Sequence, residues 1–223
     1  NEMRFSFALT EPNAGSDAAS LTMSATPDGD YFLLNGQKTF ITGAKKSNVI
    51  LVMVRTDKSL PKHKGISMFL VDSNTDGIVM RPLKKLGLKA LDLWEVFFEE
   101  VRVPRERMLG KLNEGWTNVL KVLDHERFCI SAIAIGAAQA VVDDALQYAK
   151  EREQFGQPIG KFQMIKEKLV DMQTEVDAAR LLCYRVAWML DNGRPCGRES
   201  SMAKLYSSEC YMRAGWKGVQ ILG

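Results

Sequence analysis

The sequence predicts an α+β protein, in which an antiparallel β domain is followed by a helical-bundle domain. Short apolar runs bounded by Gly, Pro, Asp and Asn dominate residues 5–103, with no helical periodicity between them. From Trp116 onward, apolar residues instead recur at three- and four-residue spacings. Because the composition changes over 104–115, we expect a β domain over 1–110 and a helical domain over 111–223.

The expected strands follow from alternation and from turn residues. Residues 5–9 alternate apolar and small side chains, and Pro12 ends regular pairing because it has no backbone N–H. Asn35-Gly36, after a short strand over 31–34, is a strong two-residue hairpin signal. Strands this close together favour an antiparallel barrel or sandwich over a parallel sheet. The other expected strands are 21–25, 49–54, 66–71 and 95–103.

Three helices are expected in the second half. The first runs from about residue 116 to 153, where Phe155-Gly156 ends it, and its small residues at 131–140 favour close helix packing. A second helix begins at Phe162 or Gln163 and ends near Leu190. The third begins at Glu199 or Ser200.

Composition excludes several classes of protein. The chain has 223 residues, 46% hydrophobic and 26% charged, which is typical of a soluble globular protein. Its net charge of +3 is spread without a long basic block, so it gives no support to nucleic-acid binding. The four cysteines lack metal-ligand spacing and indicate reduced thiols in an intracellular protein, and we expect no membrane span.

The stretch over 9–17 carries the strongest sign of a ligand site. Ala14 and Gly15 leave the backbone nearly bare, so an anionic ligand could approach main-chain N–H groups, with Ser16 adding a hydroxyl donor. The alternative interpretation is a surface turn capped by Ser16 and Asp17.

Two further pairs of side chains could serve a site. Phe40 and Thr42 are two apart on an expected strand and should point to the same face. Asp124 and Arg127 share a helix face, which is equally typical of a surface ion pair. Glu126 points about 100° away from Arg127 around that helix. No spacing around either histidine supports metal or triad chemistry.

Several of these stretches, taken together and in order, resemble the acyl-CoA dehydrogenase family. The resemblance covers nearly the whole chain and rests on the runs Phe7–Asp17, Lys38–Ala44, Asp124–Arg127 and Arg152–Gly156, on Gln163 and on Gln220–Gly223.

On the flavin side, the resemblance implies that Leu9, Thr10 and Ser16 bind FAD and that Ser16 also borders the acyl-CoA thioester. It places Phe40 beside the isoalloxazine, where the family usually has Trp, and the Thr42 hydroxyl at flavin N5. The indole N–H of that Trp is lost in this chain.

On the substrate side, the resemblance makes Asp124 and Arg127 acyl-CoA contacts. Glu126 is the candidate catalytic base, because isovaleryl-CoA and long-chain acyl-CoA dehydrogenases carry theirs at this position. Most of the family instead supplies the base from a C-terminal segment, which would lie beyond Gly223. The stretch 89–94 departs most from the family, so the surroundings of the acyl end stay open.

A third set of residues is implied to contact the FAD of a neighbouring subunit, which implies a homo-oligomer, a dimer of dimers. This set comprises Arg152, Gln154, Gln163, Gln220 and Gly223.

The resemblance therefore implies a FAD enzyme of fatty acid metabolism that desaturates an acyl-CoA and passes electrons to an electron-transfer flavoprotein. An enoyl-CoA reductase, like crotonobetainyl-CoA reductases, and an acyl-CoA oxidase are alternatives, and so is a flavin-free scaffold that binds acyl-CoA or a partner chain. We expect a bacterial cytoplasmic or mitochondrial matrix location, with the family's N-terminal helical domain and C-terminal end outside this chain.

Overall fold

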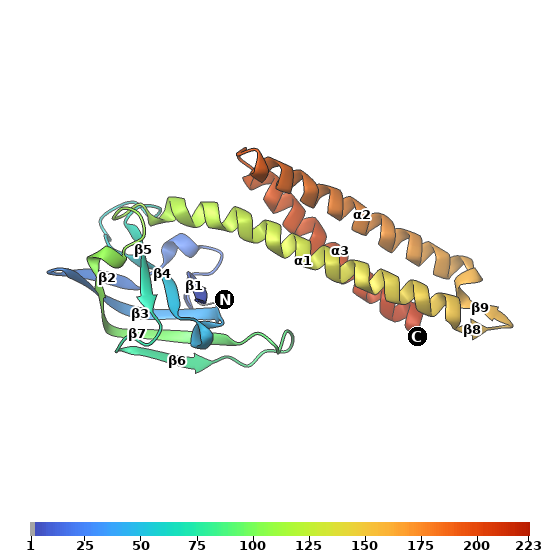
Figure 1. Cartoon of the computed structure of the whole chain (residues 1–223), viewed down its shortest axis with the longest axis horizontal. Helices are drawn as coiled ribbons and strands as arrows, with labels where there is room; N and C mark the ends of the chain where they lie inside the picture. The colour runs from blue at the N-terminus through green and yellow to red at the C-terminus, as the bar shows by residue number, and fades with distance from the viewer. Residues whose placement is uncertain (1–2) are drawn as a thin grey trace. The chain divides into compact units, whose positions relative to one another are not determined.

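The computed structural model describes residues 3–223, which divide into two units, one up to Val119 and one from Leu120. The first is a curled β-sheet that forms a half-barrel, and the second consists of long helices joined by short connections (Figure 1). The α+β class expected from the sequence is confirmed.

The sheet has the strand order β1-β4-β2-β3-β7-β6, and β5 pairs with β4. Most neighbours are antiparallel, but β1 pairs with β4 in parallel, so the sheet is not wholly antiparallel as the sequence indicated. The strands are β1 (Phe5–Ala8), β2 (Ser24–Asp28), β3 (Tyr31–Thr42), β4 (Val49–Arg55), β5 (Ile66–Asp72), β6 (Ile78–Pro82) and β7 (Leu93–Pro104), with short 3₁₀ turns η1 (Ala18–Ser20), η2 (Ala44–Lys46) and η3 (Arg105–Arg107).

The expected hairpin turn at Asn35-Gly36 is wrong. β3 continues through both residues, and the turn before it lies at Gly29-Asp30, where β2 meets β3. The Asn35 side chain instead bonds across to β7, accepting the backbone N–H of Glu100 at 2.8 Å at a shift in pairing register. Asn and Gly there serve a β-bulge, a use of the same residue types that the sequence pattern does not distinguish from a turn. Strand β6 was also not expected.

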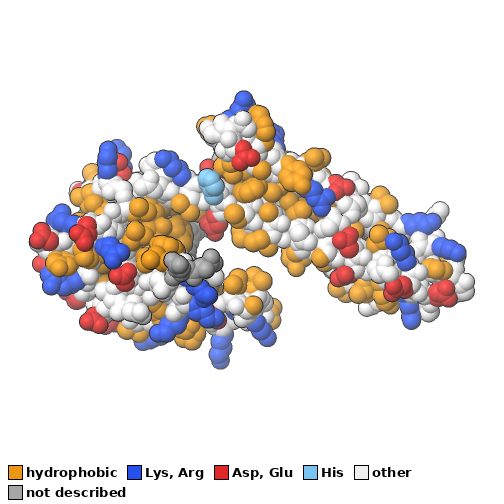
Figure 2. Space-filling model, in the orientation of Figure 1, with side chains coloured by type: hydrophobic (Ala, Val, Ile, Leu, Met, Phe, Trp, Pro, Cys, Tyr) orange, Lys and Arg blue, Asp and Glu red, His pale blue; other side chains and the backbone are white. Residues whose placement is uncertain are grey.

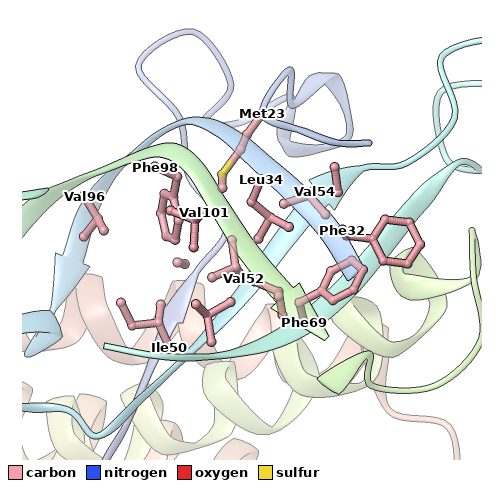
Figure 3. Close-up of a cluster of buried hydrophobic side chains, with 14 of the residues drawn as sticks. Met23, Phe32, Leu34, Ile50, Val52, Val54, Phe69, Val96, Phe98 and Val101 are labelled. Atoms are coloured by element: carbon pink, nitrogen blue, oxygen red, sulfur yellow. The ribbon is translucent and has the colours of Figure 1, made fainter. Parts of the chain in front are cut away.

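The core of the β unit is built from the inward residues of its strands (Figure 3). Phe32 on β3 and Phe69 on β5 are fully buried, with ring centroids 5.0 Å apart. Val52 and Val54 alternate inward along β4, as period-2 patterning predicts. Each such side chain contributes about 1.5–3 kcal/mol by leaving water.

The helical unit contains α1 (Gly115–Glu151, whose first turn belongs to the β unit), α2 (Gln163–Asp191) and α3 (Gly197–Leu222). These bounds agree with the expected helices to within three residues. Between α1 and α2 lies a hairpin that the sequence analysis did not include, formed by β8 (Glu153–Gln154) and β9 (Gln157–Pro158) and followed by η4 (Ile159–Lys161).

Cross-helix contacts fix the directions of the three helices. Arg185 on α2 pairs with Glu199 at 3.2 Å, and Asp171 pairs with Lys217 at 3.2 Å, so α2 and α3 are antiparallel. Gln139 on α1 donates to Gln173 on α2 at 3.1 Å. Small and medium apolar side chains from all three helices form one buried cluster.

α1 is long and apolar enough, by length and composition alone, to cross a membrane, although the sequence analysis expected no such run. A core helix of a soluble protein passes the same test. Here Ala138, Val142, Ala145 and Ala149 lie in the buried cluster shared with α2 and α3, although only 33% of the most apolar window of α1 is buried within the described part of the chain.

Two glycines of α3 should respond in opposite ways to alanine. A Cβ at Gly215 meets open space, so Gly215→Ala should stabilise the chain by about 0.5–1 kcal/mol through helix propensity. A Cβ at Gly218 would lie 2.6 Å from Val141 Cγ1, so Gly218→Ala should be at least ~1 kcal/mol less stable than Gly215→Ala. Urea unfolding followed by circular dichroism measures both, and equal stabilisation would rule out a tight α1–α3 approach.

Candidate functional site

The turn after β1 is closed by its own backbone. Glu11 N–H donates to Ala14 O at 3.2 Å and Ala14 N–H to Glu11 O at 3.1 Å, which leaves Pro12 and Asn13 exposed at the tip. Thr39 N–H on β3 donates to Thr10 O at 2.9 Å. The structure therefore brings Thr10 beside the strand that carries Phe40 and Thr42, although the two are far apart in sequence.

Beneath this turn lies a buried ion pair. Lys38 Nζ is 2.9 Å from Glu11 Oε1 and also donates to Leu9 O at 2.9 Å. Lys38 is 0% and Glu11 4% exposed. The Glu11 carboxylate accepts three further bonds, from the backbone N–H and hydroxyl of Thr22 at 2.7 and 2.9 Å and from Met23 N–H at 3.0 Å. Every charge in the pair is thus matched by donors or acceptors.

Burial shifts the titration of both partners. It raises the pKa of the Glu11 carboxyl, but Lys38 and the N–H donors more than offset this, so the pKa lies below its ordinary value. Burial lowers the pKa of the Lys38 ammonium to about 8, against the opposing attraction of Glu11.

The strand that follows Lys38 contains a second β-bulge, between Lys38 and Ile41. Lys38 and Thr39 are both buried, Ile41 is buried, and Phe40 and Thr42 are exposed. Phe40 has φ +59°, a left-handed conformation that a bulky residue adopts at a cost, and it is 62% exposed. An exposed aromatic held in a strained backbone is typical of a ligand-binding position.

The far end of the 9–17 stretch is held by polar contacts. Asp17 accepts the Ser20 hydroxyl at 2.6 Å and forms an ion pair with Lys62. The Lys62 ammonium and the Ser20 hydroxyl hold the pKa of Asp17 below its ordinary value. Ser16 beside it is exposed. Asp17 therefore anchors the stretch, as the capped-turn interpretation expected, while Ser16 faces solvent.

A hollow of about 400 Å³ lies where β6 ends and β7 begins, in the stretch that departs most from the family. β7 carries Leu93 opposite Thr42 and Trp94 opposite Ile41, so the hollow adjoins the strand end with the exposed aromatic. Among the described residues, the buried indole Nε1 of Trp94 has no hydrogen-bond partner. The hollow is lined by Pro82, Leu83, Lys84, Lys85, Lys89, Leu91, Asp92, Leu93 and Trp94.

In the helical unit, Asp124 is engaged within the chain. Its Oδ1 pairs with Arg127 Nη1 at 2.9 Å and accepts the Ser200 hydroxyl of α3 at 3.1 Å. Asp124 therefore links α1 to α3 and orients Arg127, which agrees with the ion-pair interpretation. Glu126, one position before Arg127, is exposed.

The residues expected to contact a neighbouring subunit's FAD gather at the other end of the helical unit. Arg152 follows the last residue of α1, Gln154 lies in the hairpin and Gln163 begins α2. Because α3 is antiparallel to α2, Gln220 and Gly223 reach that same end. A helix rises about 1.5 Å per residue, so Arg127 and Arg152 are about 38 Å apart along α1.

The hairpin at this end exposes an aromatic. Phe155 is 93% exposed with φ +53°, and its ring meets that of Phe162 edge-on at 6.1 Å. The sequence analysis used Phe155 only as a helix-ending signal. The left-handed conformation and the exposure of Phe155, like those of Phe40, could be recognised only from the three-dimensional structure.

No group of three or more His, Cys, Asp or Glu side chains in residues 3–223 could hold a metal ion. The four cysteines are free thiols, three of them buried.

Comparison with known proteins agrees with this architecture. Residues 6–101 match the acyl-CoA dehydrogenase middle domain, and residues 113–223 match the acyl-CoA dehydrogenase C-terminal domain. Butyryl-CoA dehydrogenase from Megasphaera elsdenii superposes with a TM-score of 0.97 at 38% identity, over 99% of this chain and 58% of that one.

Two curated relatives are similarly close. The chain is 43% identical to the 3-(aryl)acrylate reductase of Clostridium sporogenes, over 100% of this chain and 59% of the relative. It is 43% identical to the CarC subunit of the caffeyl-CoA reductase-Etf complex of Acetobacterium woodii, over 99% and 58%. The chain thus spans less than three fifths of these relatives.

The chain combines a β half-barrel with long antiparallel helices, and it exposes an aromatic ring and a hydroxyl at the edge of the half-barrel. This is the architecture of the two matched domains. The chain belongs to the acyl-CoA dehydrogenase family.

The sequence analysis missed the partners that hold these residues. Lys38 was quoted only as part of a motif, although a lysine between the apolar run 32–34 and Ile41 of one strand is almost never fully buried without a partner. The only acid in the turn after β1 is Glu11, which could have been proposed as that partner. The Asp124–Ser200 contact had no comparable signal.

The strain at Phe40 can be measured without any ligand. Phe40→Gly and Phe40→Ala lose the same ring, but only Ala keeps a Cβ at φ +59°. Phe40→Gly should therefore be more stable than Phe40→Ala by about 1 kcal/mol, the reverse of the order at an ordinary strand position. Guanidinium unfolding of both variants decides this, and a more stable Ala variant would show that the left-handed conformation is absent in solution.

Proposed function

We propose that the protein containing this chain is a FAD-dependent acyl-CoA dehydrogenase, which desaturates the α,β bond of an acyl-CoA. The observation that carries the proposal is the Thr39–Thr10 hydrogen bond, which aligns the turn after β1 with an exposed, strained Phe40 and an exposed Thr42. A flat aromatic cofactor fits this surface, because the Phe40 ring is available for stacking and the Thr42 hydroxyl for hydrogen bonding.

In this proposal, Leu9, Thr10 and Ser16 hold one edge of FAD, Phe40 stacks beside its ring system, and Thr42 donates a hydroxyl to N5. When bound, FAD supplies the hydride acceptor that no side chain can provide. Ser16 is exposed and so is free to border the thioester of the substrate as well.

On the substrate side, we assign Arg127 to acyl-CoA binding, and its orientation comes from Asp124 at 2.9 Å. Glu126 is the candidate base that takes the α-proton. It is exposed in this chain, so bound substrate or segments outside 3–223 would have to desolvate it.

A second candidate is the reverse reaction, reduction of an enoyl-CoA. It is favoured by the names of two relatives at 43% identity, a 3-(aryl)acrylate reductase and a subunit of a caffeyl-CoA reductase-Etf complex. The second name also supports an electron-transfer flavoprotein as partner. Rapid enoyl-CoA-dependent reoxidation of the reduced flavin would identify a reductase, and rapid reoxidation by oxygen would identify an oxidase.

A bacterial cytoplasmic or mitochondrial location remains part of the proposal.

The arrangement of the helical unit supports assembly into a homo-oligomer, a dimer of dimers. Arg152 lies about 38 Å from Arg127 along the axis of α1, and Gln154, Gln163, Gln220 and Gly223 gather at the same end as Arg152, so these residues and the candidate substrate contacts occupy opposite ends of the helical unit. A neighbouring copy would let both ends serve complete sites. Hydrophobic side chains gather on part of the helical unit in Figure 2, as on a surface that a partner covers. The exposed apolar side chains of α2 and α3 include Leu181, Tyr184, Trp188, Leu205, Met212 and Trp216.

Glu126→Gln tests the base. In the full-length protein, the variant should keep FAD and acyl-CoA affinity, while flavin bleaching by substrate in anaerobic stopped-flow falls at least about a hundredfold, because the carboxylate that accepts the α-proton is gone. Asp144→Asn is the control, since it removes an exposed carboxylate from the same helix away from both groups of site residues. Bleaching within a few-fold of the parent would move the base to another segment.

A mixed oligomer tests whether FAD bridges copies. Arg152→Ala and Phe40→Ala, produced separately, should each bind FAD poorly. Co-expressed with different affinity tags, the mixed oligomer should regain FAD in about half of its sites, because one site then combines an intact Phe40 with an intact Arg152 of another copy. Sedimentation with detection at the flavin band measures this. If the mixed oligomers hold as little FAD as each variant alone, then Phe40 and Arg152 belong to different sites, or to one site within a single chain.

A further inference from the structure

The buried pair of Lys38 and Glu11 joins three segments that are separate in sequence. Lys38 belongs to β3, Leu9 and Glu11 to the turn after β1, and Thr22 and Met23 to the segment before β2. Both charged side chains are at least 96% buried, and the contacts between the segments run from 2.7 to 3.0 Å. The network therefore has one geometry in which all its polar groups are satisfied.

The bulge that follows Lys38 decides which side chains of β3 face outward. In a regular strand with Lys38 inward, Phe40 would point inward as well, and Thr39 and Ile41 would face solvent. The bulge between Lys38 and Ile41 reverses this phase, so that Ile41 is buried while Phe40 and Thr42 are exposed. Lys38 anchors the strand before the bulge and Ile41 anchors it after the bulge.

The stability of the fold does not by itself account for two buried charges. Apolar side chains of similar volume would do as well or better, because desolvation consumes most of the attraction between the ions. An apolar pair has no directional bonds. The Lys38 ammonium, by contrast, bonds to the Leu9 carbonyl and to the Glu11 carboxylate, and so ties two points of the turn to one atom of β3. A ligand site built from two separate segments requires such directional bonds, because they hold the two segments in one relative position.

We infer that Lys38 and Glu11 are positioning residues for the flavin, locking the turn that carries Leu9 and Thr10 against the bulge that presents Phe40 and Thr42. The inference rests on the proposed function, because it names the residues that preorganise the same site. Neither residue touches the reacting atoms. Both act through the backbone that they hold.

The test compares full-length Lys38→Met and Glu11→Gln with a core variant that loses stability elsewhere. Phe69→Ala on β5 is that control, because Phe69 is fully buried and its ring meets β3 at Phe32, six residues before Lys38. All proteins are measured well below their unfolding midpoints, with far-ultraviolet circular dichroism to confirm folding.

Two readouts report positioning rather than stability. Lys38→Met and Glu11→Gln should weaken FAD binding at least about tenfold and shift the visible circular dichroism of the flavin, because displaced groups lose a large part of their contribution. Amide hydrogen exchange over 9–16 and 39–42 in the FAD-free protein should quicken in both variants. In Phe69→Ala, FAD affinity and exchange in these segments should stay within about threefold of the parent.

The outcomes separate this inference from the proposed function. If the parent binds FAD but both variants match Phe69→Ala in affinity and exchange, the pair is only structural and the inference is overturned. If the parent binds no FAD, the proposed function fails, and the inference fails with it. Should Lys38→Met not fold, Glu11→Gln alone decides, because it keeps the volume and one acceptor oxygen of the native side chain.

Discussion

The buried ion pair of Lys38 and Glu11 is the interaction on which the candidate site of the β unit depends, because both charges have lost their contact with water. Removing either Lys38 or Glu11 would leave its partner buried and unpaired, at a cost of about 3–5 kcal/mol, a large share of the stability of an ordinary domain. The pair therefore couples the turn after β1 to the residue of β3 that precedes the bulge. Beyond the bulge, Phe40 and Thr42 are exposed, and Phe40 has a left-handed backbone conformation.

The helical unit separates its candidate chemistry along one long helix. Asp124 and Arg127 lie near the start of α1, where Ser200 of α3 braces them, and Arg152 lies at the opposite end beside the hairpin. Gly218 of α3 permits a close approach to α1, since a Cβ at that position would lie 2.6 Å from Val141 Cγ1.

Most of the fold was predictable because local patterns agree with it. The helices obey three- and four-residue periodicity, and β4, β5 and β7 are apolar runs bounded by loop residues. Prediction failed where one residue type serves two purposes. Asn35-Gly36 forms a bulge rather than a hairpin, because Glu100 of a distant strand engages Asn35. The parallel pairing of β1 with β4 likewise depends on contacts that no local pattern specifies.

The sequence by itself determined the α+β class, the change from strands to helices, and the motifs that identify the family and its candidate residues. Only the tertiary structure decided that Lys38 pairs with Glu11, that Asp124 is bound to Ser200, and that Phe40 is strained and exposed. The physical reason is that periodicity and propensity act between near neighbours. A buried charge, by contrast, is satisfied by whichever segments the fold brings within about 3 Å of it.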